Sequence, residues 1–360
     1  MDGIVDLKGF ERERERWEDL YRLDEHAQVF LSWPWLRAFL TTSRARWRIL
    51  LLREGDTLLA ALPVATRGVP SRAFPVAREL TFASSPLADY QGILCRPGYE
   101  QRAIRGFVSA LSRARWERAV LRDVADPRIA ELLERLSLRG EAVETRGGSR
   151  CAGLALPASW DDFTRSLDSD TRKPLLRRMR RLEELPGLRK TVADDTDFEQ
   201  HLEALLALHH RRWGGNLARA RAQRGTLFRE AYRHGALRIL GLWDGATPIA
   251  MQALFDDPIR KTVGAFQTGY DPAYAKYGPG KALVALAIRD AIERGYTYFD
   301  HLRGDESYKE ELCNRERTTT NYYLRRKGMR AAALDAVLPS YRAVKGAAIR
   351  VVYGPGRTFY

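Results

Sequence analysis

The sequence predicts an α+β fold built as two tandem units, in which mixed, mostly antiparallel sheets are flanked by helices. The first observation is length, because 360 residues exceed the usual size of one domain and fit two. The second is hydrophobic periodicity, which switches between strand and helix spacing along the chain. The third is a pair of hairpin signals, Gly55-Asp56 in the first half and Asp244-Gly245 in the second.

In the first unit, interspersed charges predict an exposed helix, and two alternating apolar runs predict a hairpin. Pro34 is placed to start the second helix, with Ser32 as its cap. Residues 80–94, which contain Pro86 and Gly92, predict loops and short strands. The expected elements are helices over 11–24, 29–40, 101–115 and 127–139, and strands over 47–54, 57–68 and 118–124.

The second unit repeats this alternation over a longer stretch. A strongly basic helix ends at Pro186 and Gly187, and the acidic run from Asp194 to Asp197 supplies caps for a long helix. We expect helices over 160–167, 171–185, 197–213, 226–234 and 280–294, a short helix from 305, and strands over 188–192, 237–243, 248–256, 260–268, 296–301 and 318–324. The predicted domains are 1–148, 149–329 and a basic C-terminal tail over 330–360.

The chain is strongly basic, with a net charge of +14 and a pI of about 9.9. This balance favours anionic partners, among them nucleic acid, acidic lipid and phosphorylated cofactors, through long-range attraction. Arginine also greatly outnumbers lysine, and codon bias in a GC-rich genome explains the same charge without any function. Both explanations stay open on the sequence alone.

The cysteines and the apolar runs indicate a cellular compartment. Cys95, Cys151 and Cys313 are widely spaced and form neither a CxxC pair nor a disulfide framework, which suits a reducing cytosol. The charged N-terminus lacks the apolar run of a signal peptide. No apolar run reaches the roughly 18–20 residues that a membrane span needs. We therefore expect a soluble cytoplasmic protein.

The turn from Tyr277 to Ala282 lies between a predicted strand and a predicted long helix. Its glycines, Gly278 and Gly280, let the backbone approach a bulky anion closely. The helix that follows offers free amide groups and the positive end of its dipole, and Lys281 adds a formal charge. These features predict a cradle for the pyrophosphate of coenzyme A or for a phosphopantetheine arm. The alternative is a tight loop that only caps a helix.

The stretch 266–324 carries three features of a known family: a Tyr-x-Pro-Gly turn that opens a helix, a strand that ends in Phe-Asp, and a Gly-x-x-x-Tyr-Lys segment. Here these are Tyr277, Pro279 and Gly280; Phe299 and Asp300; and Gly304, Tyr308 and Lys309. Over 160–324 the chain resembles the cellulose-biosynthesis-associated acyltransferases of the acetyltransferase-like (GNAT) superfamily. It is similar, more distantly, to the Fem-type aminoacyl transferases that build peptidoglycan cross-bridges. The resemblance implies two tandem GNAT domains, a degenerate first one on the acceptor side and a second one with the acyl-donor site.

The resemblance also implies an N-acyltransferase that moves an acyl group from acyl-CoA or acyl carrier protein to a small-molecule or peptide amine. Such a reaction needs a base for the amine, dipoles that stabilise the oxyanion and an acid for the leaving thiolate. The family places a tyrosine acid at Tyr308. Asp300 and Glu306 are candidates to orient the acceptor, and Lys309 is a candidate phosphate contact. Pro279 interrupts the usual superfamily turn, which leaves donors other than acetyl-CoA open.

Two adjacent histidines lie on the helix predicted over 197–213. His210 is the candidate general base, because histidine titrates near physiological pH, and the alternative is a histidine that only packs. His209 and His210 face different directions on a helix, so they cannot share one metal ion. The sequence contains no HExxH motif or carboxylate cluster, and we expect no metal cofactor. An aromatic cluster in the first half can line an acceptor pocket, although a core role fits it better; it comprises Phe30, Trp33, Trp35, Phe39 and Trp47.

The helix over 171–185 carries basic residues beside an apolar stripe. It fits a carrier-protein surface, tRNA, nucleotide phosphate or anionic lipid, and equally a solvated face. The tail over 330–360 is a candidate for peripheral membrane contact, although a packed terminal helix fits it better. Two alternatives to thioester-dependent acyl transfer stay open: tRNA-dependent aminoacyl transfer of the Fem type, and a non-catalytic nucleic-acid-binding or scaffold protein with the same fold.

Overall fold

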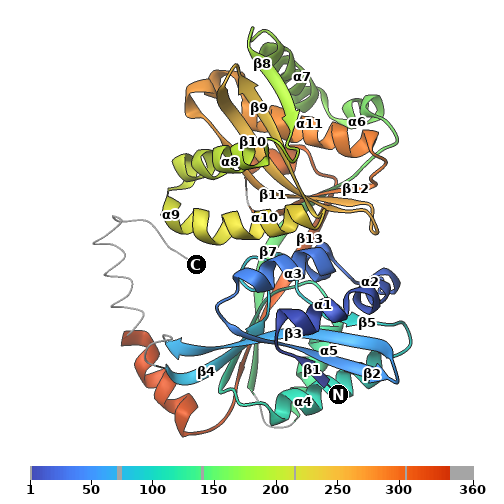
Figure 1. The fold of residues 1–360 in the computed structure, drawn as a ribbon, viewed down its shortest axis with the longest axis vertical. Coiled ribbons are helices and arrows are strands. Elements are labelled where there is room, and N and C mark those ends of the chain that lie inside the picture. Colours follow the sequence, from blue (N-terminus) through green and yellow to red (C-terminus); the bar gives the residue numbers. More distant parts are fainter. Residues whose placement is uncertain (1, 71–74, 139–141, 215, 305, 341–360) are drawn as a thin grey trace. The chain divides into compact units, whose positions relative to one another are not determined.

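The chain folds into two compact units (Figure 1). The computed structural model describes residues 2–70, 75–138, 142–214, 216–304 and 306–340, without the side chains of Trp213, Ser307 and Tyr308. Of these residues, the first unit holds 2–26, 43–148 and 320–340, and the second holds 27–42, 149–214, 216–304 and 306–319. The chain therefore crosses between the units several times. The acceptor and donor roles expected for the two domains stay predictions.

The first unit is a sheet with helices on both faces. Its strands follow the order β1-β2-β3-β4-β6-β13, with β5 beside β3, and each pair is antiparallel except β4 with β6. The elements are β1 (Asp2–Ile4), α1 (Leu7–Arg12), α2 (Arg14–Leu23), β2 (Arg46–Glu54), β3 (Thr57–Pro70), β4 (Pro75–Phe82), β5 (Leu94–Cys95), α4 (Glu100–Arg113), β6 (Arg118–Val124) and α5 (Pro127–Ser137). Two strands, β7 (Ala142–Ala155) and β13 (Arg315–Arg325), run from one unit into the other. Residues 329–340 are helical, and 341–360 of the expected tail lie outside the described residues.

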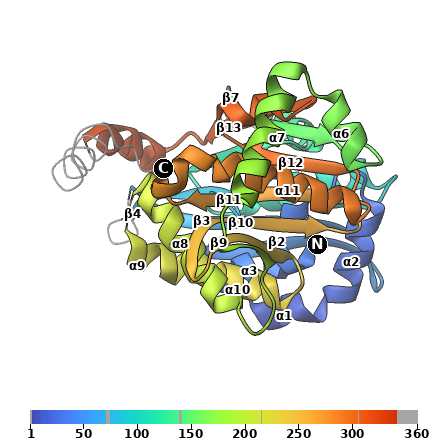
Figure 2. The same ribbon diagram turned by 90° about the horizontal axis from the view of Figure 1, so that it is seen from above.

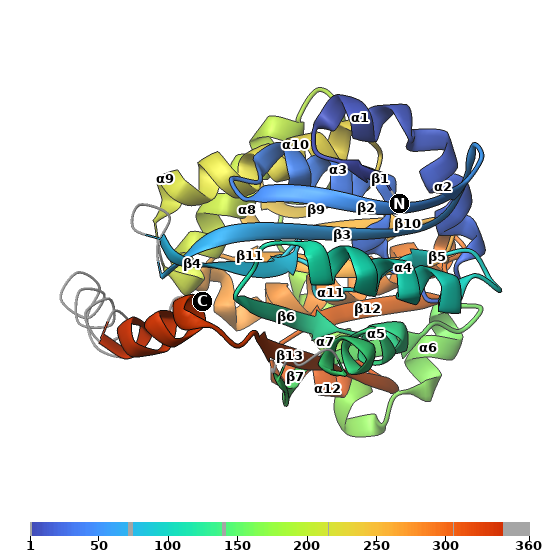
Figure 3. The same ribbon diagram turned by 90° about the horizontal axis from the view of Figure 1, so that it is seen from below.

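Helices α4 and α5 hold the main core of the first unit. Figure 3 shows α4 against strands β2 and β3 with α5 beside it, and α1 and α2 on the other side of these strands. The apolar stripes of α4 and α5 supply Phe107 and Leu132, which join Leu62 of β3 in one buried cluster. Helix α5 begins where sequence chemistry predicts, because Asp126 caps it and Pro127 occupies its first position.

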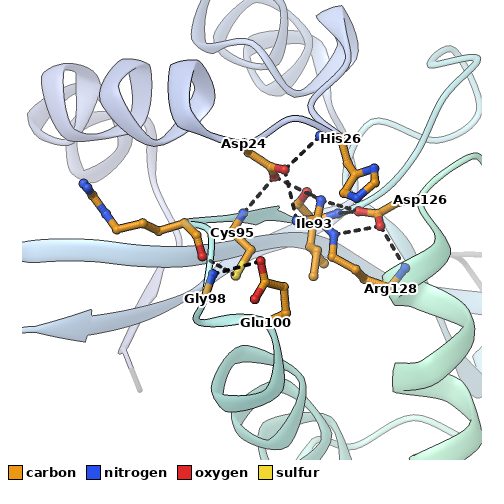
Figure 4. A network of polar contacts seen from close by, with 9 residues as sticks. Asp24, His26, Ile93, Cys95, Gly98, Glu100, Asp126 and Arg128 are labelled. Carbon is orange, nitrogen blue, oxygen red and sulfur yellow. Dashed lines mark hydrogen bonds and ion pairs between the residues drawn. The ribbon is translucent and has the colours of Figure 1, made fainter.

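A buried network of charges connects α2, β5 and α5 in the first unit (Figure 4). Both Nη atoms of Arg128 donate to the Asp24 carboxylate at 3.0 Å, and Nε and Nη2 donate to Asp126 at 2.8 Å. Asp24 also accepts from the backbone N–H of Cys95 at 2.8 Å and of His26 at 3.0 Å. Burial raises the pKa of the Cys95 thiol to about 12, so this cysteine stays protonated.

The second unit is also a sheet between helices. Its strands follow the order β7-β12-β11-β10-β9-β8, in which β11 and β12 run parallel and the other neighbours are antiparallel. The elements are η1 (Val29–Leu31), α3 (Trp33–Thr42), α6 (Trp160–Ser166), α7 (Ser169–Glu183), β8 (Leu188–Val192), α8 (Phe198–Trp213), α9 (Leu217–Ala220), η2 (Arg221–Gly225), α10 (Thr226–Arg233), β9 (Leu237–Asp244), β10 (Thr247–Asp257), β11 (Thr262–Tyr270), η3 (Pro272–Tyr277), α11 (Pro279–Glu293), β12 (Tyr298–Arg303) and α12 (Ser307–Glu311).

Helices cover both faces of the β9–β11 sheet. Figure 2 shows α7 and α11 on one side of these strands and α8 and α10 on the other. The apolar face of α11 packs in a buried cluster with β9 and β10, to which α7 adds Leu175 and Leu182. On the opposite face, Gly269 of β11 lets α8 come close, because a Cβ atom there would lie 2.5 Å from the backbone nitrogen of His209.

The aromatic side chains of residues 27–42 belong to the core of the second unit. Trp35 is fully buried and meets the rings of Phe255 and Phe266 at centroid distances of 4.6 and 5.5 Å. Phe30 and Phe39 pack on the same indole ring. These contacts support the core role that the sequence favours for this cluster, and they explain why α3 groups with a unit more than a hundred residues away in the chain.

Several described elements differ from the sequence-based expectation. Strand β4 is a regular strand, whereas loops and short strands were expected beginning at residue 80. Strand β7 is long, although most of its residues are polar or glycine and no strand was expected there. Helix α9 and the π-helical turn η2 fill a segment without an expected element. In β7, contacts with distant strands rather than local apolar alternation decide the conformation. The side chain of Asn321 on β13 donates to the Gly147 carbonyl of β7 and accepts from the backbone N–H of Asp123 on β6.

Candidate functional site

The parallel strands β11 and β12 separate soon after they begin. Their pairing covers three residue pairs, from Thr262 with Tyr298 to Gly264 with Asp300. Beyond Gly264, β11 continues to Tyr270 without a further pair to β12 in the described part of the chain. The pairing of β11 with β10 also shifts by one residue at Phe266, which marks a β-bulge. Beyond Gly264, the edge of β11 that faces β12 therefore presents backbone N–H and C=O groups that do not pair with β12.

The helix N-terminus expected to bind phosphate lies directly after β11 and η3. Gly278 has φ of 62°, a left-handed conformation that favours glycine, and Pro279 occupies the first helical position. No side chain among the described residues caps the helix. Among the described residues, the N–H groups of Gly280 and Lys281 have no acceptor, whereas Ala282 donates to the Gly278 carbonyl at 3.2 Å. Two amide donors and the positive end of the helix dipole are thus available to an anion.

An arginine from α7 lies over this turn. A Cβ atom on Gly278 would lie 2.7 Å from Cδ of Arg178, so the arginine stem covers the glycine. No carboxylate within the described residues pairs with Arg178. Tyr270 packs against Gly280 from the other side, 3.2 Å from the position of a Cβ atom there. Arg178 is the cation that sequence reasoning missed at this position, because it was treated only as part of a basic surface.

Lys281 and Tyr277 were expected to contact the donor, and the structure shows each of them in local contacts. Lys281 Nζ donates to both carboxylate oxygens of Glu311, at 2.6 and 2.8 Å. Tyr277 packs on the core of the second unit, with Lys276 Nζ 4.9 Å from its ring centroid. Ala282 is fully buried, so only its backbone faces the turn. Direct contacts of these residues with a donor stay predictions.

Lys309 holds the loop after β12 together. Its buried ammonium donates to the Arg303 carbonyl at 2.7 Å and forms an ion pair with Glu306 at 3.0 Å. Gly304, with φ of 137°, passes so close that a Cβ atom would lie 2.6 Å from Lys309 Nζ. The two candidate site residues Glu306 and Lys309 are therefore adjacent and neutralise each other.

Asp300 shapes the end of β12. Its carboxylate is buried and accepts from the backbone N–H of Leu302 at 2.7 Å, while Leu302 has φ of 57°. An aspartate that bonds two residues ahead stabilises such a bend. The neighbouring His301 is buried and contacts the Leu312 carbonyl through Nε2 at 3.1 Å, and burial lowers its pKa to about 4. Asp300 thus has a local role beside any role in orienting an acceptor.

The remaining catalytic candidates lie on α12 and α8. The Tyr308 side chain is outside the described residues, and its role as an acid stays a prediction. His210 is half-buried near the end of α8, and no hydrogen bond of its side chain is found within the described part of the chain. The adjacent His209 is placed differently, because its Nε2 lies 3.0 Å from Arg224 Nη1 and burial lowers its pKa to about 4. Of these two histidines, His210 is therefore the one whose ring makes no hydrogen bond within the described residues.

A cavity of about 930 Å³ lies in the first unit, between strands β2 to β4 and the end of α4. Its basic lining residues are Arg46, Arg48, Arg78, Arg113 and Arg115, and Trp47 of the aromatic cluster also lines it. Its volume is within the range of small-molecule sites.

The described residues contain neither a metal-ligating cluster nor a helix able to span a membrane. No group of three or more histidine, cysteine, aspartate or glutamate side chains is placed to hold a metal ion there. Nor does any described helix combine the length and apolar character that crossing a membrane requires. The expectation of a chain without a metal cofactor stays a prediction.

Comparison with known proteins identifies the fold. Residues 169–310 match a family model described as an acetyltransferase (GNAT) domain. The structure of FemX covers 90% of this chain and 97% of its own, with 9% identity and a TM-score of 0.61. The C-terminal domain of a putative lysylphosphatidylglycerol synthetase from Agrobacterium fabrum covers 92% and 96%, with 11% identity and a TM-score of 0.56. L-PGS from Bacillus licheniformis covers 88% and 92%, with 14% identity and a TM-score of 0.55. No curated protein matches the sequence.

These findings confirm the predicted α+β fold of the acetyltransferase (GNAT) type and the predicted structural similarity to Fem-type proteins. The matched domain begins with α7 and ends in α12, so it contains the β11–β12 separation and the α11 N-terminus. At 9–14% identity the solved structures show the fold alone. Acyl transfer in general is supported by the domain match, and the donor and the acceptor are a matter for proposal.

Proposed function

We propose that the second unit is the catalytic domain of an N-acyltransferase, which moves an acyl group from a thioester to an amine. The observation that carries this proposal is the separation of β11 from β12 beside an uncapped helix N-terminus. The unpaired edge of β11 suits the amide-bearing arm of coenzyme A or phosphopantetheine, which binds as an added strand. The amides of Gly280 and Lys281, together with Arg178, take the phosphates.

In the proposed reaction, the amine nitrogen attacks the thioester carbonyl carbon. A C–N bond forms, the carbonyl oxygen becomes an oxyanion, and the C–S bond then breaks to release the thiolate. Backbone N–H groups near the Phe266 bulge stabilise the oxyanion. The amine loses a proton to a base, for which His210 is the candidate, and the thiolate gains one from an acid, for which Tyr308 is the candidate.

The donor is acyl-CoA or an acyl group on a carrier protein. The test is calorimetric titration with acetyl-CoA, a long-chain acyl-CoA and an acylated carrier protein, followed by release of free thiol in the presence of an amine. Gly280→Glu places a carboxylate at the helix N-terminus and should abolish binding of each donor, because it repels the phosphates. Unchanged donor binding by this variant would exclude the α11 N-terminus as the phosphate site.

A second candidate is aminoacyl transfer from charged tRNA. The α7 helix favours it, because Arg172, Arg177, Arg180 and Arg181 have no ion pair within the described residues and could contact a phosphate backbone. Binding of tRNA through about six phosphates would weaken roughly a thousandfold between 50 and 200 mM salt, whereas binding of a CoA thioester would change far less. The salt dependence therefore separates the two donors. Absence of both activities would favour a non-catalytic scaffold or nucleic-acid-binding protein.

The finer assignments belong to the same proposal. A cytoplasmic location fits the supply of acyl thioesters there, and acyl carrier protein is the macromolecular partner that the basic α7 face would bind. Membership of the cellulose-biosynthesis-associated subfamily rests on the motifs around Tyr277, Phe299 and Tyr308. A contact of the basic tail with a membrane surface is the remaining partner proposal.

A further inference from the structure

Arg224 lies in the second unit and has no counter-ion within the described residues. It is half-buried in η2, and its Nη1 donates to Gln267 Oε1 at 2.9 Å and to His209 Nε2 at 3.0 Å. No carboxylate among the described residues pairs with it. Its neighbours on the same stretch behave differently, because Arg221 forms an ion pair with Glu203 and Arg229 with Glu199.

A half-buried cation that has only neutral partners is unusual, since desolvation of the charge is normally offset by a carboxylate. Burial lowers the pKa of Arg224, and the positive charge of Arg303 lowers it further. Arg303 is the last residue of β12, so two cations from different elements lie close together on the second unit. The charge of Arg224, whose partners within the described residues are neutral, would attract an external anion.

Gln267 provides a second and independent observation. Its side chain is 5% exposed, and its buried Nε2 atom has no hydrogen-bond partner in the part of the chain that the structure describes. A guanidinium can only donate, so the contact with Arg224 fixes Oε1 on the arginine and leaves Nε2 as an unused donor. A buried donor that makes no hydrogen bond is unfavourable, and a ligand acceptor would satisfy it. Gln267 follows the Phe266 bulge on β11, next to the edge assigned to the thioester.

His209 is a neutral partner of Arg224 and leaves the positive charge of the arginine uncompensated. Because Nε2 accepts from Arg224, the ring proton lies on Nδ1, which faces the Thr268 carbonyl at 3.3 Å. Burial holds the pKa of His209 at about 4, so the ring is neutral at physiological pH. His209 thus orients Arg224 without adding a negative or a positive charge, and it is a positioning residue.

We propose that Arg224 and Gln267 bind an anionic group of the acceptor, either a carboxylate or a phosphate, and so select amines that carry such a group. The inference rests on the proposed acyl transfer and specifies its substrate class. The guanidinium supplies the charge and the Gln267 amide supplies a second donor, which is the pairing that carboxylate and phosphate oxygens accept. A neutral amine would leave both groups unsatisfied and would bind more weakly.

The first test measures ion binding without catalysis. Inorganic phosphate and acetate are titrated at constant ionic strength, with tryptophan fluorescence as the readout. Arg224→Gln should weaken binding of the preferred ion at least tenfold, whereas Arg221→Gln, which removes the same charge from the same π-helical turn, should not. The ion that binds more tightly identifies the group as phosphate or carboxylate. Equal binding by wild type and Arg224→Gln, or no binding of either ion, would overturn the proposal.

Gln267→Glu distinguishes binding from a structural role. The new carboxylate would pair with Arg224, so the variant should be more stable than wild type and should also lose ion binding at least tenfold. If Arg224 only stabilised the fold, stability would rise while ion binding stayed unchanged, and that result would contradict the proposal.

The last test uses the acylation reaction. Thiol release from the thioester is compared for β-alanine against its amide and for phosphoethanolamine against ethanolamine. Arg224→Gln should raise KM for the anionic member of the preferred pair at least tenfold and leave KM for the thioester unchanged. If no amine releases thiol, the proposed function fails, while the ion titration still decides the anion site independently. An equal KM for charged and neutral amines in wild type would overturn the selection of anionic acceptors.

Discussion

Replacing Arg128 by methionine tests how the first unit is stabilised. The Arg128 guanidinium makes four hydrogen bonds to the carboxylates of Asp24 and Asp126 and one to the Ile93 carbonyl. Asp24 is 1% exposed and Asp126 is 6% exposed. Methionine preserves most of the side-chain volume, so the change removes the cation and leaves two buried carboxylates facing each other (Figure 4).

The expected loss follows from this geometry. Removing one partner of a buried ion pair costs about 3–5 kcal/mol, because the remaining charge stays desolvated. Arg128 serves two carboxylates, so the upper part of that range applies. Arg135→Met is the matched control on the same helix, since it removes an exposed pair with Glu131 at 2.8 Å that is worth about 0.3–0.5 kcal/mol.

The assay is equilibrium urea unfolding, followed by far-ultraviolet circular dichroism and by tryptophan fluorescence. Two units can unfold separately, so the transition that shifts is compared between the two variants. We expect Arg128→Met to lower the unfolding free energy of one transition by about 3–5 kcal/mol with an unchanged second transition. A loss below about 1 kcal/mol, no larger than that of Arg135→Met, would refute the reasoning.

Two further predictions concern the second unit. Burial lowers the pKa of His301 from 6.5 to about 4, so the unfolded chain binds a proton below pH 6.5 that the folded chain does not, and stability should fall as the pH drops from about 6.5 to 4. His301→Gln should reduce this loss by about 2–3 kcal/mol between pH 7 and 4.5 in urea unfolding, and an unchanged pH dependence would contradict the prediction. Gly269→Ala should destabilise the fold by about 1–3 kcal/mol, because the new Cβ atom meets the α8 backbone at 2.5 Å. Gly264→Ala on the same strand meets only Leu302 at 3.6 Å, and an equal effect of both substitutions would rule out the α8 contact as the cause.

Local sequence signals predicted the elements that depend on local chemistry. The first hairpin turns at Gly55 and Asp56, as expected, because Gly55 adopts φ of 56°. Helix α11 begins at Pro279 after a left-handed Gly278, which is the arrangement that the turn sequence indicates. The order of helices and strands across the acetyltransferase-type domain was visible for the same reason.

Long-range contacts could not be predicted in this way. Lys281 was expected to be available for phosphate, but it pairs with Glu311, thirty residues further along the chain. The position of Arg178 over Gly278 depends on how α7 packs against η3, and no local pattern contains that information. Residues 27–42 belong to the second unit because of aromatic contacts such as that of Trp35 with Phe255, and these two residues lie far apart in the sequence.

At the candidate site, the sequence therefore predicts the turn and its flanking elements but not the ion pairs of the charged side chains. The turn at Gly278 and Gly280 lies between the strand and the helix that the sequence predicts, and its role as a phosphate cradle stays a prediction. The contacts of Lys309 with Glu306 and the Arg303 carbonyl are short-range, yet their role in closing a loop emerges only from the left-handed geometry of Gly304. Burial and ion pairing with carboxylates, rather than residue type, decide which cationic side chains can bind an anion.

The most direct test of the account is the dissociation constant for coenzyme A, measured by calorimetry for wild type, Arg178→Gln and Arg177→Gln. The second substitution removes an equal charge from the adjacent, exposed position on α7. A charge-assisted contact to phosphate is worth about 1.5–3 kcal/mol, so Arg178→Gln should weaken binding by about 10- to 100-fold and Arg177→Gln by far less. Equal effects of both variants, or binding that neither variant changes, would contradict the assignment of the donor phosphates to the α11 N-terminus.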